Sequence, residues 1–205
     1  MMGEPPTLFE PHSWPSPAPP AGASVDGVRH VAGWLDDADQ HLEELNRLIR
    51  WEQPTVTVYG RQHPTPRLSA WFGDRTYSYS GFTHRPAPFP AAVAEIGERL
   101  RAELGVEFNS CLAQLYRNGS DSMGAHADDE WELGPRPVIA SVSLGASRRF
   151  VMVNTDTKHR HEWLLGGGDL LVMSGDAQRD YRHSLPKTTR TVGPRLNLTF
   201  RRIIR

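Results

Sequence analysis

The sequence predicts a mainly β fold with flanking α-helices, in which two early helices pack outside a double-sheeted or barrel-like β core. Two amphipathic segments lie in the first half of the 205-residue chain. After Gly105 the sequence changes to short β-rich runs separated by Gly, Pro and Asp. The final run, RLNLTFR at 195–201, alternates between polar and apolar residues at every step, as a strand with two different faces does.

The composition is that of an ordinary globular chain. With 38% hydrophobic and 23% charged residues, it fits a single domain with one well-buried core. No apolar run approaches the roughly 20 residues that a membrane-spanning helix needs, and the opening MMGEPPTLFEPHSWPS lacks the apolar core of a secretion signal. The lone Cys111 excludes an intrachain disulfide framework and a multi-cysteine zinc cluster. We therefore expect an intracellular protein without membrane contact, cytoplasmic in a bacterium or nuclear in a eukaryote.

Charge is distributed unevenly along the chain. The net charge is −1, but residues 158–205 carry 10 Lys and Arg against 4 Asp and Glu. This asymmetry permits a local basic surface for nucleic acid, and it is equally typical of a solvated basic tail.

The elements before Gly105 are a leader and two helices. Residues 1–24 contain seven of the 17 prolines, which predicts a disordered leader before a single domain at 25–205. DDADQHLEELNRLIRW, from Asp36, predicts an amphipathic helix behind aspartate caps. Its apolar positions are Leu35, Ala38, Leu42, Leu45 and Ile49. A second helix is predicted at 90–104, where a proline opens the segment and a glycine follows it.

Six later runs have the composition of strands: NSCLAQLY, VIASVSLG, RRFVMVN, EWLLGGG, DLLVMS and RLNLTF. The GGG at 166–168 is predicted to be a turn, because a phosphate-binding loop would lead into a helix and DLLVMS is typical of a strand. Alternation in the final run places four polar residues on one face: Arg195, Asn197, Thr199 and Arg201. That face either meets solvent or lines a pocket in which the two arginines bind carboxylates.

GAHADDE, 124–130, places His126 two residues before Asp128, and His183 follows 55 residues later. Two imidazoles and one carboxylate on one side of a metal, with open positions opposite, are typical of non-haem Fe(II) oxygenases. The open positions admit a chelating 2-oxo acid and dioxygen, and an arginine holds the distal carboxylate of the acid. A strand through His126 and Asp128 would point both side chains the same way.

The order of these motifs, HAD, then His183, then PRLNLTFR, resembles the AlkB family of Fe(II)/2-oxoglutarate dioxygenases, which repair N-alkylated bases. The similarity extends from about residue 55 to the C-terminus through PRLSAWFGD, YSYSG, QLYRNGSDSMGAHADDE, PVIASVSLGASRRF and HSLPKTTRTVGPRLNLTFR, and it is greatest to the eukaryotic-type branch that acts on methylated DNA. The resemblance implies a double-stranded β-helix (jelly-roll) core at about 105–205 and a nucleotide-recognition lid at about 55–85. It also implies Fe(II), 2-oxoglutarate and O2 as cofactors.

The resemblance implies roles for individual residues. His126, Asp128 and His183 would bind iron. Arg201 would bind the distal carboxylate of 2-oxoglutarate, and Arg195 would lie near its metal-binding end.

The same resemblance places Tyr116, Asn197 and Thr199 in the co-substrate pocket. Gln114 departs from the family, which has Asn at this position, two residues before the tyrosine of LYRNG. This longer amide either reaches 2-oxoglutarate differently or does not reach it.

On the substrate side, Glu130 resembles the acid that accepts a hydrogen bond from the damaged base, and its charge suits cationic 1-methyladenine or 3-methylcytosine. Asp129 is either a second such acid or a solvated loop residue. Tyr77 and Tyr79, with Ser80 next to them, would contact a flipped nucleotide, or they are ordinary half-buried sheet residues.

VTVYGRQH, 56–63, occupies the place where the duplex-repairing branch carries an aromatic finger on a hairpin. Tyr59 would then fill the gap left by a flipped base. The alternative is that Tyr59 only packs its hairpin against the sheet.

The implied reaction couples oxidative decarboxylation of 2-oxoglutarate to hydroxylation of the N-methyl carbon, after which the hemiaminal releases formaldehyde. The expected partner of this monomer is alkylated DNA, single- or double-stranded, with RNA as an alternative. Other hypotheses are a small-molecule or protein hydroxylase, a non-catalytic binder of alkylated DNA, and a zinc hydrolase. His159 and His161 in KHRHEW imitate a metal-binding pair, but their basic surroundings favour a surface loop.

Overall fold

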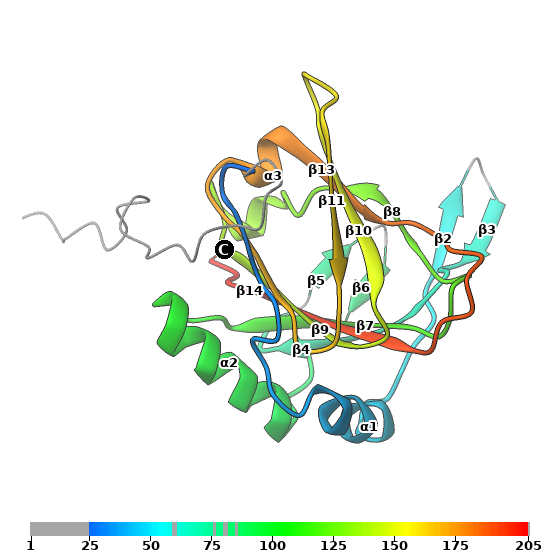
Figure 1. Ribbon diagram of the computed structural model, residues 1–205. Coiled ribbons are helices and arrows are strands. Elements are labelled where there is room, and N and C mark those ends of the chain that lie inside the picture. Colours follow the sequence, from blue (N-terminus) through cyan, green and yellow to red (C-terminus); the bar gives the residue numbers. More distant parts are fainter. Residues whose placement is uncertain (1–24, 59–60, 76, 80–81, 85, 205) are drawn as a thin grey trace, which may run out of the picture.

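Two antiparallel sheets packed face to face form the body of the protein. The computed structural model describes residues 25–58, 61–75, 77–79, 82–84 and 86–204, so the proline-rich leader expected at 1–24 lies outside the described residues. The six-stranded sheet comprises, in spatial order, β1 (Val28–Val31), β12 (Leu170–Met173), β9 (Ile139–Gly145), β14 (Arg195–Arg201), β7 (Ser110–Tyr116) and β4 (Leu68–Gly73). The four-stranded sheet comprises β11 (Arg160–Leu165), β10 (Arg148–Asn154), β13 (Tyr181–Leu185) and β8 (Met123–His126). This architecture confirms the expected jelly-roll (Figure 1).

Two hairpins stand apart from these sheets. They are β2 (Thr55–Val58) with β3 (Arg61–Pro64), and β5 (Tyr77–Tyr79) with β6 (Phe82–His84). The β2–β3 hairpin projects from the body on the right of Figure 1. Between them in sequence, β4 pairs with β7 as an edge strand of the six-stranded sheet. The core sheet therefore extends beyond the range 105–205 expected for it, and the range 55–85 expected for a lid includes a core strand.

Two helices cover the outer face of the six-stranded sheet, as the amphipathic patterns predict. α1 (Ala38–Leu48) and α2 (Ala91–Leu104) lie together below this sheet in Figure 1. Leu45 of α1 and Ile96 of α2 are buried in one cluster with the apolar face of β14. Because that face is buried under the helices, the polar face of β14 is turned toward the second sheet.

The sequence signals predicted one helix end correctly and one incorrectly. Gly105 ends α2 in a left-handed conformation (φ 64°), and its N–H donates to the carbonyl of Arg101, as the glycine stop predicts. At α1 the expected aspartate cap is wrong. Asp37 occupies the cap position with φ 55°, and its side chain makes no capping hydrogen bond. Within the described residues, no helix is long and apolar enough to cross a membrane.

The later strands follow the sequence closely. The GGG segment forms the turn between β11 and β12, as predicted. His161 was expected in a loop but lies in strand β11, whereas His159 precedes that strand and is exposed. A second apolar cluster, which includes Phe150 and Met152 of β10 and Leu112 of β7, fills part of the space between the sheets. Polar residues of β14 and its neighbours, together with several apolar side chains, line the pocket that remains between the sheets.

Candidate metal centre and co-substrate pocket

His126, Asp128 and His183 come together between the sheets, as their order in the sequence suggested. Each offers a donor atom, and these atoms all lie within 4.8 Å of one another. His126 and His183 are directly opposite on β8 and β13, with ring centroids 4.1 Å apart. The Nε2 atom of His126 lies 3.7 Å from Oδ1 of Asp128. Two imidazoles and one carboxylate are thus close enough together to bind a single metal ion.

An irregularity in β8 points His126 into this space. His183 pairs with His126 and Leu185 pairs with Met123, so three steps on β8 oppose two steps on β13. Met123 and His126 both line the pocket, although simple alternation would put residues three apart on opposite faces. The extra residue of a β-bulge explains this orientation. β8 ends at His126, so the expectation that one strand would carry both His126 and Asp128 is wrong.

Neighbouring groups orient the ligands. The Nδ1 atom of His126 lies 2.9 Å from the carbonyl oxygen of Gly124, which assigns the proton to Nδ1 and leaves Nε2 available to a metal. Arg201 places Nη2 2.9 Å from Oδ2 of Asp128, while Oδ1 is buried and accepts no hydrogen bond from the described residues. The backbone N–H of Asp128 donates to Oε1 of Gln178 at 2.9 Å. No sequence motif pointed to Gln178, because its contact depends on the fold.

The electrostatics of the site favour the protonation states that a metal requires. Burial raises the pKa of the Asp128 carboxyl, but Arg201 and the two imidazoles outweigh this effect, and the pKa falls to about 2. Burial, together with His126 and Arg201, lowers the pKa of His183 to about 3. The pKa of His126 is also lowered, mainly by burial. At neutral pH the carboxylate is therefore charged and both imidazoles are neutral, so the residues fit a divalent metal.

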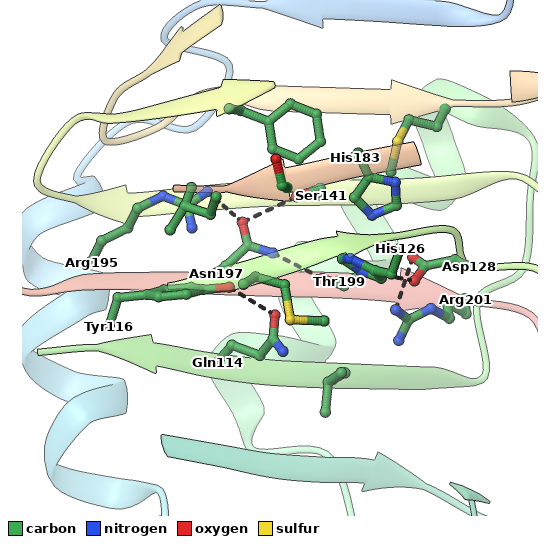
Figure 2. A pocket seen from close by; sticks show the side chains of 16 residues that line it. Gln114, Tyr116, His126, Asp128, Ser141, His183, Arg195, Asn197, Thr199 and Arg201 are labelled. Carbon is green, nitrogen blue, oxygen red and sulfur yellow. Dashed lines mark hydrogen bonds and ion pairs between the residues drawn. The ribbon is translucent and has the colours of Figure 1, made fainter. Parts of the chain in front are cut away.

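A pocket runs along the polar face of β14 away from this centre. It is lined by residues of both sheets: Leu112, Gln114, Tyr116, Met123, His126, Asp128, Ser141, Phe150, Met173, His183, Ser184, Leu185, Arg195, Asn197, Thr199 and Arg201. Figure 2 shows Arg195 at one end and the histidines with Asp128 and Arg201 at the other. Asn197 connects the two ends, because its Oδ1 accepts from Arg195 at 2.7 Å and its Nδ2 donates to Thr199 at 2.8 Å.

Arg195 is a buried cation without a carboxylate partner among the described residues. Its Nη2 donates to Ser143 Oγ at 2.8 Å, and its guanidinium lies 5.5 Å from the ring centroid of Tyr116. Burial lowers the pKa of Arg195 to about 10. A cation held in this way favours an anionic ligand, because burial without a counter-charge is costly.

The ends of the pocket are the reverse of those expected for the two arginines. Arg201 contacts the proposed metal ligand Asp128, and Arg195 lies at the far end. The alternation in RLNLTFR correctly placed both residues on one face. It carries no information about which end of β14 lies beside β8.

The other expected site residues are placed as follows. Gln114 lines the pocket, and its Oε1 accepts a hydrogen bond from the hydroxyl of Tyr116 at 3.2 Å. Asp129 is exposed and lies 3.6 Å from Nη2 of Arg182, and Glu130 is half-buried just before a single 3-10 turn at Trp131–Leu133. The remaining expected contacts lie outside the described residues: Tyr59, Ser80, and the side chains of Tyr77 and Tyr79.

Comparison with known proteins identifies the family. Residues 27–201 match the 2OG-Fe(II) oxygenase superfamily. The chain belongs to this superfamily. Its cofactors are therefore Fe(II), 2-oxoglutarate and O2, and the triad in the pocket has the composition of the corresponding iron site.

Several relatives are similar over most of the chain. The alpha-ketoglutarate-dependent dioxygenase alkB homolog 3 of Homo sapiens is 39% identical over 195 residues, which cover 88% of this chain and 68% of that protein. The DNA oxidative demethylase ALKBH2 of Mus musculus is 35% identical over 216 residues, which cover 92% of this chain and 90% of that protein. The structure of OsALKBH1 aligns with a TM-score of 0.64 at 20% identity, covering 88% of this chain and all of that one. A Pseudomonas putida prolyl-4-hydroxylase aligns with a TM-score of 0.53 at 19% identity, and the alignment covers 86% of this chain and 92% of that one. At these identities the two structures indicate the fold alone.

Proposed function

We propose that this enzyme removes N-methyl groups from bases of alkylated DNA by oxidation, with 1-methyladenine and 3-methylcytosine as the lesion type. The observation that carries the proposal is a pocket that joins a His-Asp-His centre to a buried arginine, in a chain 35–39% identical to the relatives named above. Bound iron would activate O2, which is the oxidant both for the conversion of 2-oxoglutarate to succinate and carbon dioxide and for the hydroxylation of the methyl carbon, which is then lost as formaldehyde.

His126, Asp128 and His183 would hold the iron. Asp128 can do so without losing its contact with Arg201, because Arg201 contacts Oδ2 and leaves Oδ1 facing the imidazoles. This division also means that Arg201 balances the charge of the carboxylate and holds one of its two oxygens.

Arg195 would bind the distal carboxylate of 2-oxoglutarate. Its guanidinium is already oriented by Ser143 and Asn197, so a carboxylate that binds it meets a fixed donor fork. Thr199 and Asn197 lie along the floor between the two ends and suit the body of a short diacid (Figure 2). Gln114 and Tyr116 bind one another, so the Gln114 amide supports the Tyr116 hydroxyl beside the acid.

The substrate would approach from the side of His126. The His126 side chain is 21% exposed, whereas those of Asp128 and His183 are almost fully buried. Glu130 follows two residues after Asp128, and we propose that it accepts a hydrogen bond from the extruded base. Asp129 is a second candidate acid for this contact.

The hairpins would contribute the remaining substrate contacts through Tyr77, Tyr79, Ser80 and Tyr59. Action on RNA and a monomeric state are parts of the same proposal. The buried thiol of Cys111 fits the reducing compartment expected for an intracellular enzyme.

One assay tests the function directly. Purified protein is incubated with Fe(II), ascorbate and 2-oxoglutarate, together with matched methylated DNA and RNA oligonucleotides, while base mass, formaldehyde and succinate are followed. We expect one formaldehyde per base repaired, with DNA as a substrate. Succinate formation that responds to a peptide or a small molecule but to neither nucleic acid would overturn the proposal in favour of another hydroxylase.

A further inference from the structure

Gln178 contacts the proposed metal centre without offering it a ligand atom. It lies on the short helix α3 (Ala177–Asp180), and its side chain is buried, with an exposed fraction of 2% for the residue. Its Oε1 accepts the backbone N–H of Asp128 at 2.9 Å, and its Nε2 donates to Sδ of Met173 at 3.4 Å. Both polar ends of this buried amide are therefore occupied.

The orientation of the amide is determined by its partners. A backbone N–H can only donate, so the oxygen of Gln178 must face Asp128. The NH2 group then faces the thioether of Met173, which is a weak acceptor and imposes no competing demand on the oxygen. An apolar residue of similar size would leave the Asp128 N–H buried without this acceptor.

Asp128 needs such a contact because β8 ends two residues earlier. The pairing of β8 with β13 stops at His126 and His183, so the sheet ladder does not hold the backbone at Asp128. Arg201 fixes one carboxylate oxygen of Asp128, but a guanidinium from β14 of the opposite sheet does not fix the backbone that carries this carboxylate. Gln178 supplies that backbone contact.

The same helix leads directly into the strand that carries the second histidine. α3 is followed by β13, and Arg182 of β13 donates from Nη1 to the carbonyl of Gln178 at 3.2 Å. Gln178 therefore joins the segment of Asp128 to the segment of His183. These two residues lie 55 positions apart in the sequence.

We propose that Gln178 is a positioning residue for the metal site: by holding the Asp128 backbone it keeps Oδ1 directed toward the two imidazoles. This inference rests on the proposed roles of His126, Asp128 and His183. It assigns Gln178 no contact with metal, 2-oxoglutarate or base.

The test measures Co(II) binding and the visible d–d spectrum of the Co(II)-loaded protein in Gln178→Leu and Gln178→Glu. Contacts of this class typically change metal affinity by about 10- to 100-fold. We expect Gln178→Leu to bind Co(II) at least about tenfold more weakly and to shift the spectrum. Gln178→Glu keeps an acceptor for the Asp128 N–H and should retain most of the affinity.

Ile96→Val is the matched stability control. Ile96 is buried in the cluster between α2 and the six-stranded sheet, away from the metal centre, so this variant should lower the melting temperature and leave Co(II) affinity unchanged. Wild-type affinity and spectrum in Gln178→Leu would overturn the positioning role, as would an equal loss in Ile96→Val. His183→Ala separates the two proposals, because Co(II) binding that survives this change would refute the metal site itself.

Discussion

The two ends of the pocket hold the same residue type in opposite electrostatic situations. At the metal end, Arg201 contacts a buried carboxylate 2.9 Å away. At the far end, Arg195 is equally buried but has only neutral partners among the described residues. The metal end is charge-balanced within the protein, whereas the far end becomes balanced only when an anion binds. In the proposed mechanism, Arg201 supports the fold and the metal ligands, and Arg195 binds the co-substrate.

This comparison predicts its largest effect at the metal end. His183→Ala and Asp128→Ala should both abolish demethylation, because an open iron site requires all three ligands. They should differ in stability. His183→Ala removes a neutral imidazole, but Asp128→Ala removes one member of the buried Arg201–Asp128 ion pair, which costs about 3–5 kcal/mol.

Formaldehyde release, Co(II) binding and urea denaturation of both variants would measure this difference. Equal free energies of unfolding for the two variants would show that the Arg201–Asp128 ion pair does not stabilise the fold. Robust turnover by either variant would refute the ligand assignment.

The next prediction concerns the far end. Arg195→Met should raise the KM for 2-oxoglutarate by roughly 10- to 150-fold, since a hydrogen bond to a charged group contributes about 1.5–3 kcal/mol. The same change should leave the melting temperature of the ligand-free protein unchanged or raise it, because it removes a buried cation that has no counter-charge.

Thermal melts with and without 2-oxoglutarate test both parts of this prediction. Wild-type protein should be stabilised by 2-oxoglutarate, and Arg195→Met should be stabilised less at the same concentration of 2-oxoglutarate. Arg149→Met on the exposed side of β10 is the matched control. It should change neither the KM for 2-oxoglutarate nor the melting temperature. A lower melting temperature for ligand-free Arg195→Met would contradict the contrast between the two arginines.

The sequence predicted the faces of β14 but not the direction of the pocket. Period-two alternation correctly separated Arg195 and Arg201 from the apolar residues between them, because each step along a strand reverses the side chain. Which end of β14 adjoins Asp128 depends on how the two sheets are stacked, and that is a long-range property. The expectation therefore reversed the two arginines while placing both in the pocket.

Two further features of the site could not be derived from local pattern. The bulge that turns His126 inward breaks the alternation from which strand faces are read. Gln178 carries no motif, because it is 50 residues from Asp128 in the sequence and meets it only in the folded chain. The helices and most core strands were predictable, since their apolar periodicity is local.

A smaller effect is expected outside the pocket. Glu130→Gln keeps the size of the side chain and removes its charge, so it should reduce repair of methylated bases more than uncoupled decarboxylation of 2-oxoglutarate. The reason is that Glu130 is proposed to contact the cationic base and not the metal. Parallel measurement of succinate and formaldehyde would test this, with Asp129→Asn as the neighbouring acid for comparison. An equal loss of both products in Glu130→Gln would indicate a structural role at the metal end.

The smallest effect is expected at Tyr59, because this residue is proposed to contact neither the metal nor 2-oxoglutarate. Tyr59 lies in the connection between β2 and β3, where an aromatic ring would fill the gap left by a flipped base. An inserted ring recovers part of the stacking that extrusion loses, and this loss is a few kcal/mol in a duplex and much less in a single strand. We therefore expect activity on both forms and a selective fall on double-stranded substrate in Tyr59→Ala. Kinetics on one lesion in the two contexts would decide the matter, because an equal fall on both, or none on the duplex, would remove the finger and leave Tyr59 as a packing residue of its hairpin.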